Sequence, residues 1–157
     1  MTLAQLLSLT SGLASDSPCL DSVSIDFEAC VDNLATTNAG RGKIPGQEFF
    51  YSDAHLQVAG LMAVKARGVA GWQNVFSEFK MQTGLFAAST FDLPSAGNPR
   101  IAGGMNMTGG DYMDFLKALK NGALLSAASM GQLLADQTAS IPIAYSPIFE
   151  GINGGPG

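Results

Sequence analysis

The chain has 157 residues, of which 46% are hydrophobic and only 13% charged, and its formal net charge is −5. About a quarter of the residues in a soluble domain are usually charged, so we expect part of the apolar surface to be covered by other protein. The Lys and Arg residues are not clustered, and the whole acidic excess lies in residues 1–40, which argues against nucleic-acid binding. The uncharged stretches are too short and too often interrupted to cross a membrane.

The opening residues predict a helix over Leu3–Leu13, because its leucines roughly share one face and Thr2 is able to cap the first turn. No basic residue precedes Arg41, so no secretory leader is expected. Without a leader, Cys19 and Cys30 are expected to be two reduced thiols, partly buried.

The segment from Leu20 to Leu34 allows two interpretations. Apolar residues alternate in its first half, as in a strand, and keep helical spacing in its second half. We expect a helix for the second half, on the spacing of Phe27, Cys30, Val31 and Leu34. Several Gly and Pro residues then predict a loop or an extended arm over Thr36–Gln47.

The strongest helical pattern follows Ser52 and Asp53, which are typical residues at a helix start, and runs to about Gln82. Gly68 and Gly71 are expected to divide it into two helices. A second irregular stretch covers Ser89–Gly110. Further along the chain, helical spacing predicts two more helices, and Pro residues predict an extended segment from Ser140 onward; the two helices are Asp111–Lys120 and Ala123–Asp136.

The predicted fold class is therefore mainly α, with a small helical core of four or five helices, long Gly/Pro-rich loops and an extended C-terminal arm. One domain is expected for residues 1–157. Within it we distinguish an acidic N-terminal segment (1–40), a helical core (48–139) and a C-terminal arm (140–157).

A search for catalytic, metal-binding and cofactor-binding residues assigns none. His55 is the only histidine, and Asp53 or Asp92 would have to orient it, but no motif selects a serine nucleophile. Zinc would need Cys19 and Cys30 with His55, at a spacing that matches no standard zinc site. No glycine-rich phosphate loop is present, and no cofactor is expected.

Aromatic residues at helical spacing, Trp72, Phe76 and Phe79, are read as core and not as the lining of a ligand pocket. Asp111 follows Thr-Gly-Gly at a predicted helix start, where a free N-terminus would attract an anion. The carboxylate of Asp111 would repel that anion, so capping is the preferred interpretation.

Scarce charge, long irregular segments and the absence of a catalytic constellation favour a non-enzymatic structural subunit of a large assembly, and a bacteriophage-like virion component is the leading hypothesis. The C-terminal arm would contact copies of the chain or other subunits, through large apolar anchors. These interface candidates are Ile143, Tyr145, Ile148, Phe149 and Ile152.

The alternative is a small helical module that binds an apolar ligand or lipid. An enzyme ranks last among the hypotheses, because it would rest on His55 or on an unrecognised pair of carboxylates. The expected location is a virion if the chain is viral, and otherwise the cytoplasm.

Overall fold

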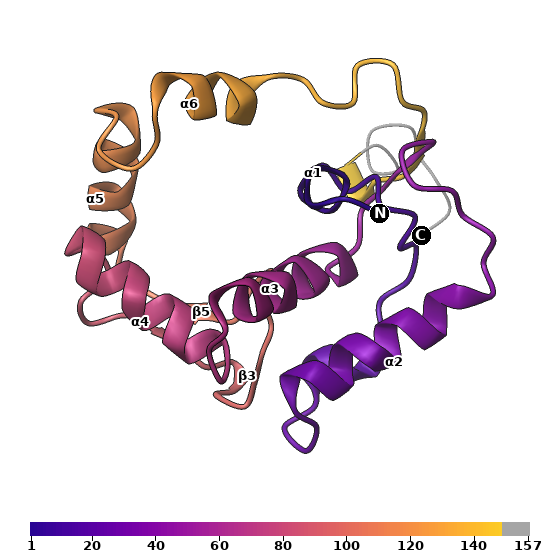
Figure 1. Ribbon diagram of the computed structural model, residues 1–157, viewed down its shortest axis with the longest axis horizontal. Helices are drawn as coiled ribbons and strands as arrows, with labels where there is room; N and C mark the ends of the chain where they lie inside the picture. The colour runs from indigo at the N-terminus through magenta and orange to yellow at the C-terminus, as the bar shows by residue number, and fades with distance from the viewer. Residues whose placement is uncertain (149–157) are drawn as a thin grey trace.

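The computed structural model describes residues 1–148, and this part of the chain is mainly helical (Figure 1). Six α-helices and one short 3₁₀ helix are present in it: α1 Leu3–Leu7, η1 Pro18–Asp21, α2 Phe27–Ala39, α3 Ala54–Arg67, α4 Trp72–Thr83, α5 Gly109–Lys120 and α6 Ala127–Leu134. The predicted fold class is confirmed, although the helices outnumber the four or five expected.

The strands are two or three residues long and form three separate pairs. The pairs are β1 Phe49–Phe50 with β6 Ile143–Tyr145, β2 Thr90–Phe91 with β5 Met105–Asn106, and β3 Pro94–Ser95 with β4 Asn98–Pro99. The first pair is parallel and the other two are antiparallel. Because β1 and β6 are far apart in the sequence, their pairing returns the C-terminal part of the chain to its N-terminal half.

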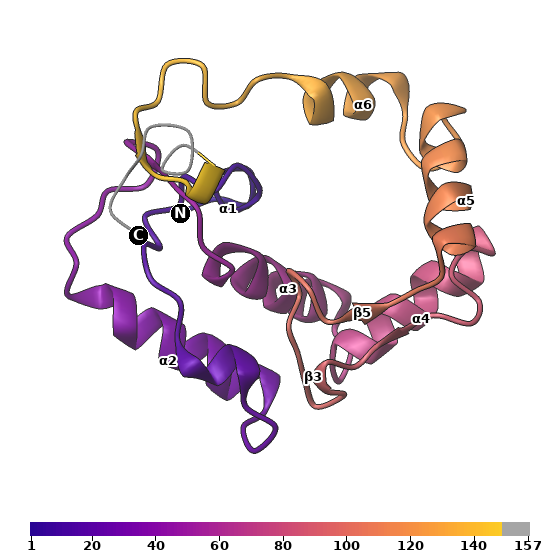
Figure 2. The same ribbon diagram turned by 180° about the vertical axis from the view of Figure 1, so that it is seen from behind.

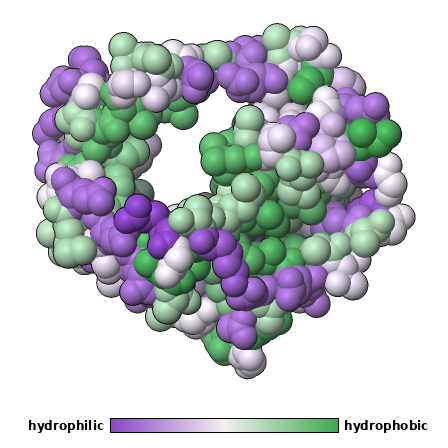
Figure 3. Space-filling model, viewed as in Figure 1, coloured by the Kyte–Doolittle hydropathy of each residue, from purple (hydrophilic) through white to green (hydrophobic). Residues whose placement is uncertain are grey.

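The elements follow one another around an opening (Figures 1 and 2). Helices α1, α2 and α3 lie together on one side, and α4 and α5 lie on the other. Helix α6 and the segment after it complete the circuit back to β6. The space-filling view shows that side chains do not close this opening (Figure 3).

Two apolar clusters hold the fold together. The first draws six of its eight buried residues from the first 40 positions, and its members are Leu6, Leu13, Cys19, Leu20, Cys30, Leu34, Ala54 and Ala59. The second joins α4 to the loop after it, through Phe76, Phe86 and Phe91. The acidic N-terminal segment therefore supplies much of the core, because its apolar residues face inward while its carboxylates stay mostly exposed.

Helix α2 confirms the prediction for the second half of the segment 20–34. Asp26 caps it by accepting a hydrogen bond from the Ala29 N–H at 2.8 Å. The helix then runs to Ala39, so the prediction of a loop from Thr36 is wrong for its first four residues. The reason is Asn38, whose buried side chain accepts from the Ala14 N–H and donates to the Ser15 carbonyl. These tertiary contacts hold the last turn in place.

The first and last helices are shorter than predicted. Helix α1 ends at Leu7 and not at Leu13, because Leu9 adopts φ 57° and turns the chain. The capping box at Thr2 is present. Helix α6 begins at Ala127 and not at Ala123, because Ser126 caps it by accepting from the Ser129 N–H at 3.1 Å.

The predicted division near Gly68 is confirmed. Gly68 has φ +63°, a left-handed conformation that ends α3 and that favours glycine, and Gly71 directly precedes α4. The preferred interpretation of Asp111 is also confirmed. Its carboxylate accepts from the Thr108 N–H at 3.2 Å, while its own N–H donates to the Thr108 hydroxyl at 3.1 Å, so the two residues form a capping box at the start of α5.

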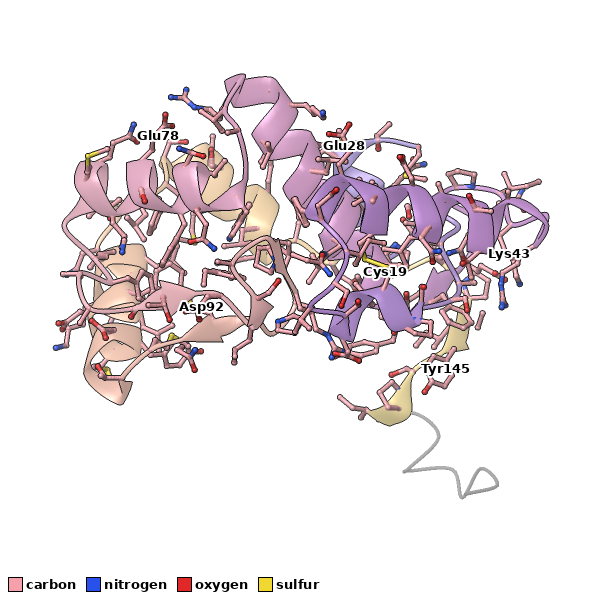
Figure 4. The ribbon with its side chains drawn as sticks, turned by 90° about the horizontal axis from the view of Figure 1, so that it is seen from below. Cys19, Glu28, Lys43, Glu78, Asp92 and Tyr145 are labelled. Atoms are coloured by element: carbon pink, nitrogen blue, oxygen red, sulfur yellow. A yellow bond between two sulfur atoms is a disulfide. The ribbon has the colours of Figure 1, made fainter. Side chains whose placement is uncertain are left out.

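The cysteines differ from the expectation. Cys19 and Cys30 form a disulfide with their Cα atoms 5.3 Å apart, so the prediction of two reduced thiols is wrong (Figure 4). The physical reason is the contact between η1 and α2, which brings the two residues together in the first cluster. The prediction rested on the expectation that no leader is present, which carries no information about this geometry.

The described part of the C-terminal arm is largely extended, as predicted, and its strand β6 pairs with β1 of the same chain. Tyr145 lies against Phe50, with ring centroids 5.0 Å apart, and Ile148 is exposed. Phe149 and Ile152 lie outside the described residues, and contacts of the five interface candidates with another subunit stay a prediction. No helix within residues 1–148 is long and apolar enough to cross a membrane.

Candidate functional site at the turn before α3

The turn Phe50–Asp53, between β1 and α3, is held by backbone hydrogen bonds from distant parts of the chain. The Phe50 N–H donates to the Leu9 carbonyl at 3.0 Å, and the Tyr51 N–H donates to the Tyr145 carbonyl at 3.0 Å. The Phe50 carbonyl in turn accepts from Nε2 of His55 at 2.9 Å. Three separate segments thus fix the backbone around Tyr51.

Side chains fix the other end of this turn. Asp16 accepts at Oδ1 from the Ser52 hydroxyl at 2.7 Å and from the Ala54 N–H at 3.0 Å, so it caps α3 from outside the helix. Asp53 accepts from Nε of Arg100 at 2.7 Å, and Arg100 also pairs with Asp21 at 2.8 Å. The side-chain hydrogen bond with Asp53 raises the pKa of Arg100 further above its ordinary value.

Tyr51 is the exposed residue of this fixed turn. Its side chain is 48% exposed, whereas Ser52 is 4% and His55 0% exposed. A phenol both donates and accepts hydrogen bonds. An exposed polar group on a rigid, well-supported backbone is typical of a functional position, because the support keeps its geometry fixed when a ligand arrives.

His55 forms a Ser–His pair, but in a place that no substrate reaches. Its Nδ1 lies 2.8 Å from the Ser11 hydroxyl. Because Nε2 faces a carbonyl, which only accepts, Nε2 carries the hydrogen and Nδ1 accepts from Ser11. Both residues are buried, at 1% exposure or less. The histidine therefore links α3 to the loop after α1, and neither Asp53 nor Asp92 orients it.

Burial lowers the pKa of His55 below its ordinary value, because desolvation disfavours the charged imidazolium. The unfolded chain then binds a proton near the ordinary pKa of about 6.5, while the folded chain does not. The contribution of His55 to the free energy of unfolding is therefore largest above that pH, and it decreases as the pH falls below it. We expect the free energy of unfolding, measured in urea from pH 7 to pH 5, to fall more steeply for the natural protein than for His55→Gln.

If the two proteins show the same slope, the burial of neutral His55 contributes nothing to the pH dependence. Glutamine is the chosen replacement because its amide retains one donor for the Phe50 carbonyl and one acceptor for Ser11.

The structure does not bring the other chemical candidates together. Cys19 and Cys30 are joined to each other, so the zinc set with His55 cannot form. Among residues 1–148, no group of three His, Cys, Asp or Glu side chains is placed to hold a metal ion. Asp92 accepts from Thr90 and Asn106 on the surface of the β2–β5 pair.

The aromatic residues predicted as core belong partly to an apolar groove. Trp72, Phe76 and Phe79 pack in or against the second cluster, as predicted, and they also line a groove of about 510 Å³ between α4 and α5. Its other walls include Phe115 and Met107. No charged side chain lines the groove, so it has the character of a packing surface.

Sequence reasoning missed Tyr51, Asp16 and Arg100 as parts of one site. The available signal was the pair Ser52–Asp53 at the helix start, which placed the element correctly. Nothing in the sequence indicated that Asp16 and Arg100 would meet it.

The comparisons with known proteins bear on what this arrangement belongs to. No family model matches the chain, and no curated protein does. One similar solved structure is described as "Crystal structure of putative beta-lactamase from Bacteroides dorei DSM 17855". It aligns with a TM-score of 0.71 and 27% identity over 96% of this chain.

The aligned region covers 47% of the Bacteroides dorei chain, so this chain spans about half the length of that protein. The similarity extends over nearly the whole of this chain, loops as well as helices. This similarity corrects the leading hypothesis from the sequence, because it indicates an enzyme-like fold and not a virion subunit. The scarce charge and the long loops therefore need another explanation.

Proposed function

We propose that this chain is the helical part of a β-lactamase-like hydrolase, which opens a strained cyclic amide or a related acyl compound by acyl transfer. The observation that carries the proposal is the alignment of nearly the whole chain with the Bacteroides dorei protein. A chain without enzymatic activity, which the sequence led us to expect, stays an untested prediction, and the proposal departs from it.

The nucleophile of such a hydrolase would come from residues outside this chain. Serine β-lactamases of one class and penicillin-binding proteins use the motifs S-x-x-K, S-D-N and K-T-G. The last two are absent from this sequence, and S-x-x-K occurs once, at Ser77–Lys80. There the Lys80 amine donates to the Ser89 carbonyl at 3.3 Å and lies 5.1 Å from the Phe76 ring centre. This lysine is engaged with α4 and the loop after it, so the motif match is fortuitous.

Tyr51 is the group that this chain would contribute. Acyl transfer needs a proton taken from the nucleophile and returned to the leaving atom; a tyrosine side chain takes a proton as the phenolate and returns it as the phenol. Asp16, Arg100 and His55 would act as positioning residues, because the hydrogen bonds of each fix the turn that carries Tyr51.

The test uses the product of the complete natural reading frame. Tyr51→Phe removes one hydroxyl and is expected to lower kcat for a chromogenic cephalosporin about 100-fold or more. The matched control is Tyr112→Phe on α5, because Tyr112 is also 48% exposed. Its kcat is expected to stay within about twofold of the natural value.

Equal effects of the two substitutions would contradict the role of Tyr51. An absence of turnover in the natural protein, with penicillins and cephalosporins alike, would contradict the proposed reaction.

A further inference from the structure

The opening enclosed by the helices is unusual for a folded chain. Protein interiors are packed about as densely as organic crystals, yet the space-filling view shows open space with hydrophobic residues along its border on two sides (Figure 3). Water in such an opening would touch apolar side chains on these two sides, which costs free energy in proportion to the apolar area exposed.

The helices around the opening carry exposed apolar side chains. In α1, Leu6 is fully buried while Leu7 is 61% exposed, and in α3 Met62 is 42% exposed. Leu116 in α5 is 37% exposed and Leu134 in α6 is 77% exposed. A helix on the surface of a finished protein would present polar residues at such positions.

Helices α5 and α6 are even less buried than the other helices around the opening. Neither has a buried residue in the described chain, although both have an apolar side. The segment 136–142, which follows α6, is largely exposed and leads back to β6 across one end of the opening (Figure 1). Its one internal backbone bond joins the Ile141 N–H to the Thr138 carbonyl. Helix α5 packs on the second cluster through Phe115, whereas α6 and the segment 136–142 have no buried residue that would fix them where they lie.

We propose that an α-helix from polypeptide outside this chain occupies the opening, and that it is apolar around most of its circumference. The length of the aligned protein supports a source in the same reading frame, because about half of that protein lies beyond the region matched here. This inference shares that observation with the proposed function, but it makes no use of catalysis.

A helix fits the opening better than a strand does. Apart from the segment 136–142 at one end, its border is formed mostly by helices, whose backbone groups already bond within each helix and offer no partners to the N–H and C=O groups of a strand. A buried helix satisfies its own backbone and packs its side chains between those of its neighbours. Contact on several sides requires an apolar surface on more than one face.

The experiment measures thiol reactivity in the complete natural product, with the Cys19–Cys30 disulfide intact. Single substitutions Leu7→Cys, Leu116→Cys and Leu134→Cys place reporters on three helices at the border of the opening. Met81→Cys, on α4, is the exposed control, because Met81 is 78% exposed. Ala59→Cys is the buried control, at 9% exposure.

The reporters on these three helices are expected to react with a maleimide about tenfold or more slowly than Met81→Cys, and at rates close to that of Ala59→Cys. Rates equal to that of Met81→Cys would overturn the proposal. That result is expected if the natural reading frame adds no residues to this chain, because nothing would then cover the reporters. Hydrogen exchange on the unsubstituted protein is the second readout. Amides of α6 that exchange as fast as those of a frayed end would overturn the proposal as well.

The two proposals fail separately. Protected reporters in a protein that cleaves no β-lactam would support the occupying helix and contradict the reaction. Reactive reporters in a protein that cleaves β-lactams would contradict the occupying helix and support the reaction.

Discussion

Replacement of Gly104 by alanine is expected to destabilise the protein by about 3 kcal/mol or more. An added Cβ at this position would lie 2.3 Å from the Leu93 carbonyl oxygen, 2.7 Å from the Arg100 carbonyl oxygen and 2.9 Å from the Arg100 nitrogen. All three atoms belong to the backbone, so no side chain is able to rotate away. The loop between β4 and β5 would have to open, and urea unfolding followed by circular dichroism measures the loss.

The neighbouring Gly103 supplies a matched control. No atom lies within 4 Å of a Cβ built there. Gly103→Ala is therefore expected to leave the free energy of unfolding within about 0.5 kcal/mol, or to raise it slightly by restricting the unfolded chain. Equal effects of the two substitutions would show that the close approach at Gly104 is not a feature of the folded protein.

The Gly104 substitution also reaches the candidate site. Gly104 accepts at its carbonyl from the N–H groups of Asp92 and Leu93, and the Arg100 N–H donates to the Leu93 carbonyl. A shift of this loop moves Arg100, whose side chain holds Asp53 close to Tyr51 in the turn. We expect Gly104→Ala to lower the rate of any reaction at Tyr51 even at temperatures where the protein stays folded.

Loss of the Cys19–Cys30 disulfide is the second large expected effect. The double substitution Cys19→Ala, Cys30→Ala is expected to lower the free energy of unfolding by about 3 kcal/mol. The bond joins residues 11 positions apart and so restricts the unfolded chain. Both residues are also buried in the first cluster, where α2 and η1 meet, so smaller side chains leave the core less well filled.

Dithiothreitol provides the control for this prediction. It should destabilise the natural protein and leave the double variant unchanged, since the variant has no bond to reduce. A natural protein whose stability is the same with and without the reductant would contradict a structural role for the bond.

The sequence predicted helices well where the signals are local. The spacing from Phe27 to Leu34 placed α2, and Gly68 placed the break between α3 and α4. Predictions failed where distant contacts decide the outcome. Asn38 extends α2 through bonds to residues 23 and 24 positions away, and no local pattern announces them. The prediction of two reduced thiols failed for a related reason, because the pairing of Cys19 with Cys30 follows from the packing of η1 on α2.

The candidate site was out of reach for the same physical reason. Asp16 and Ser52 are 36 positions apart, Ser11 and His55 44, and Asp53 and Arg100 47. A single sequence records no such meetings. Of the two hydrogen bonds that hold the ring of His55, the one from Ser11 belongs to this class, whereas the one to the Phe50 carbonyl spans only five positions.

The scarcity of charge takes on another meaning under the two proposals. The sequence led us to look for neighbouring subunits that would cover the apolar surface. The alignment with about half of a longer protein supports a cover made by the same polypeptide. On that account the exposed leucines of α1 and α6 are interior positions of a larger fold.

The most direct test of the central claim, that this chain is the part of a β-lactamase-like hydrolase without the nucleophile, is mass spectrometry of the complete natural product after acid quenching with benzylpenicillin. We predict one covalent penicilloyl adduct, on a serine outside residues 1–157, which forms more slowly in Tyr51→Phe. An adduct on Ser77 or on any other residue of this chain would contradict the claim. So would the absence of both an adduct and hydrolysis.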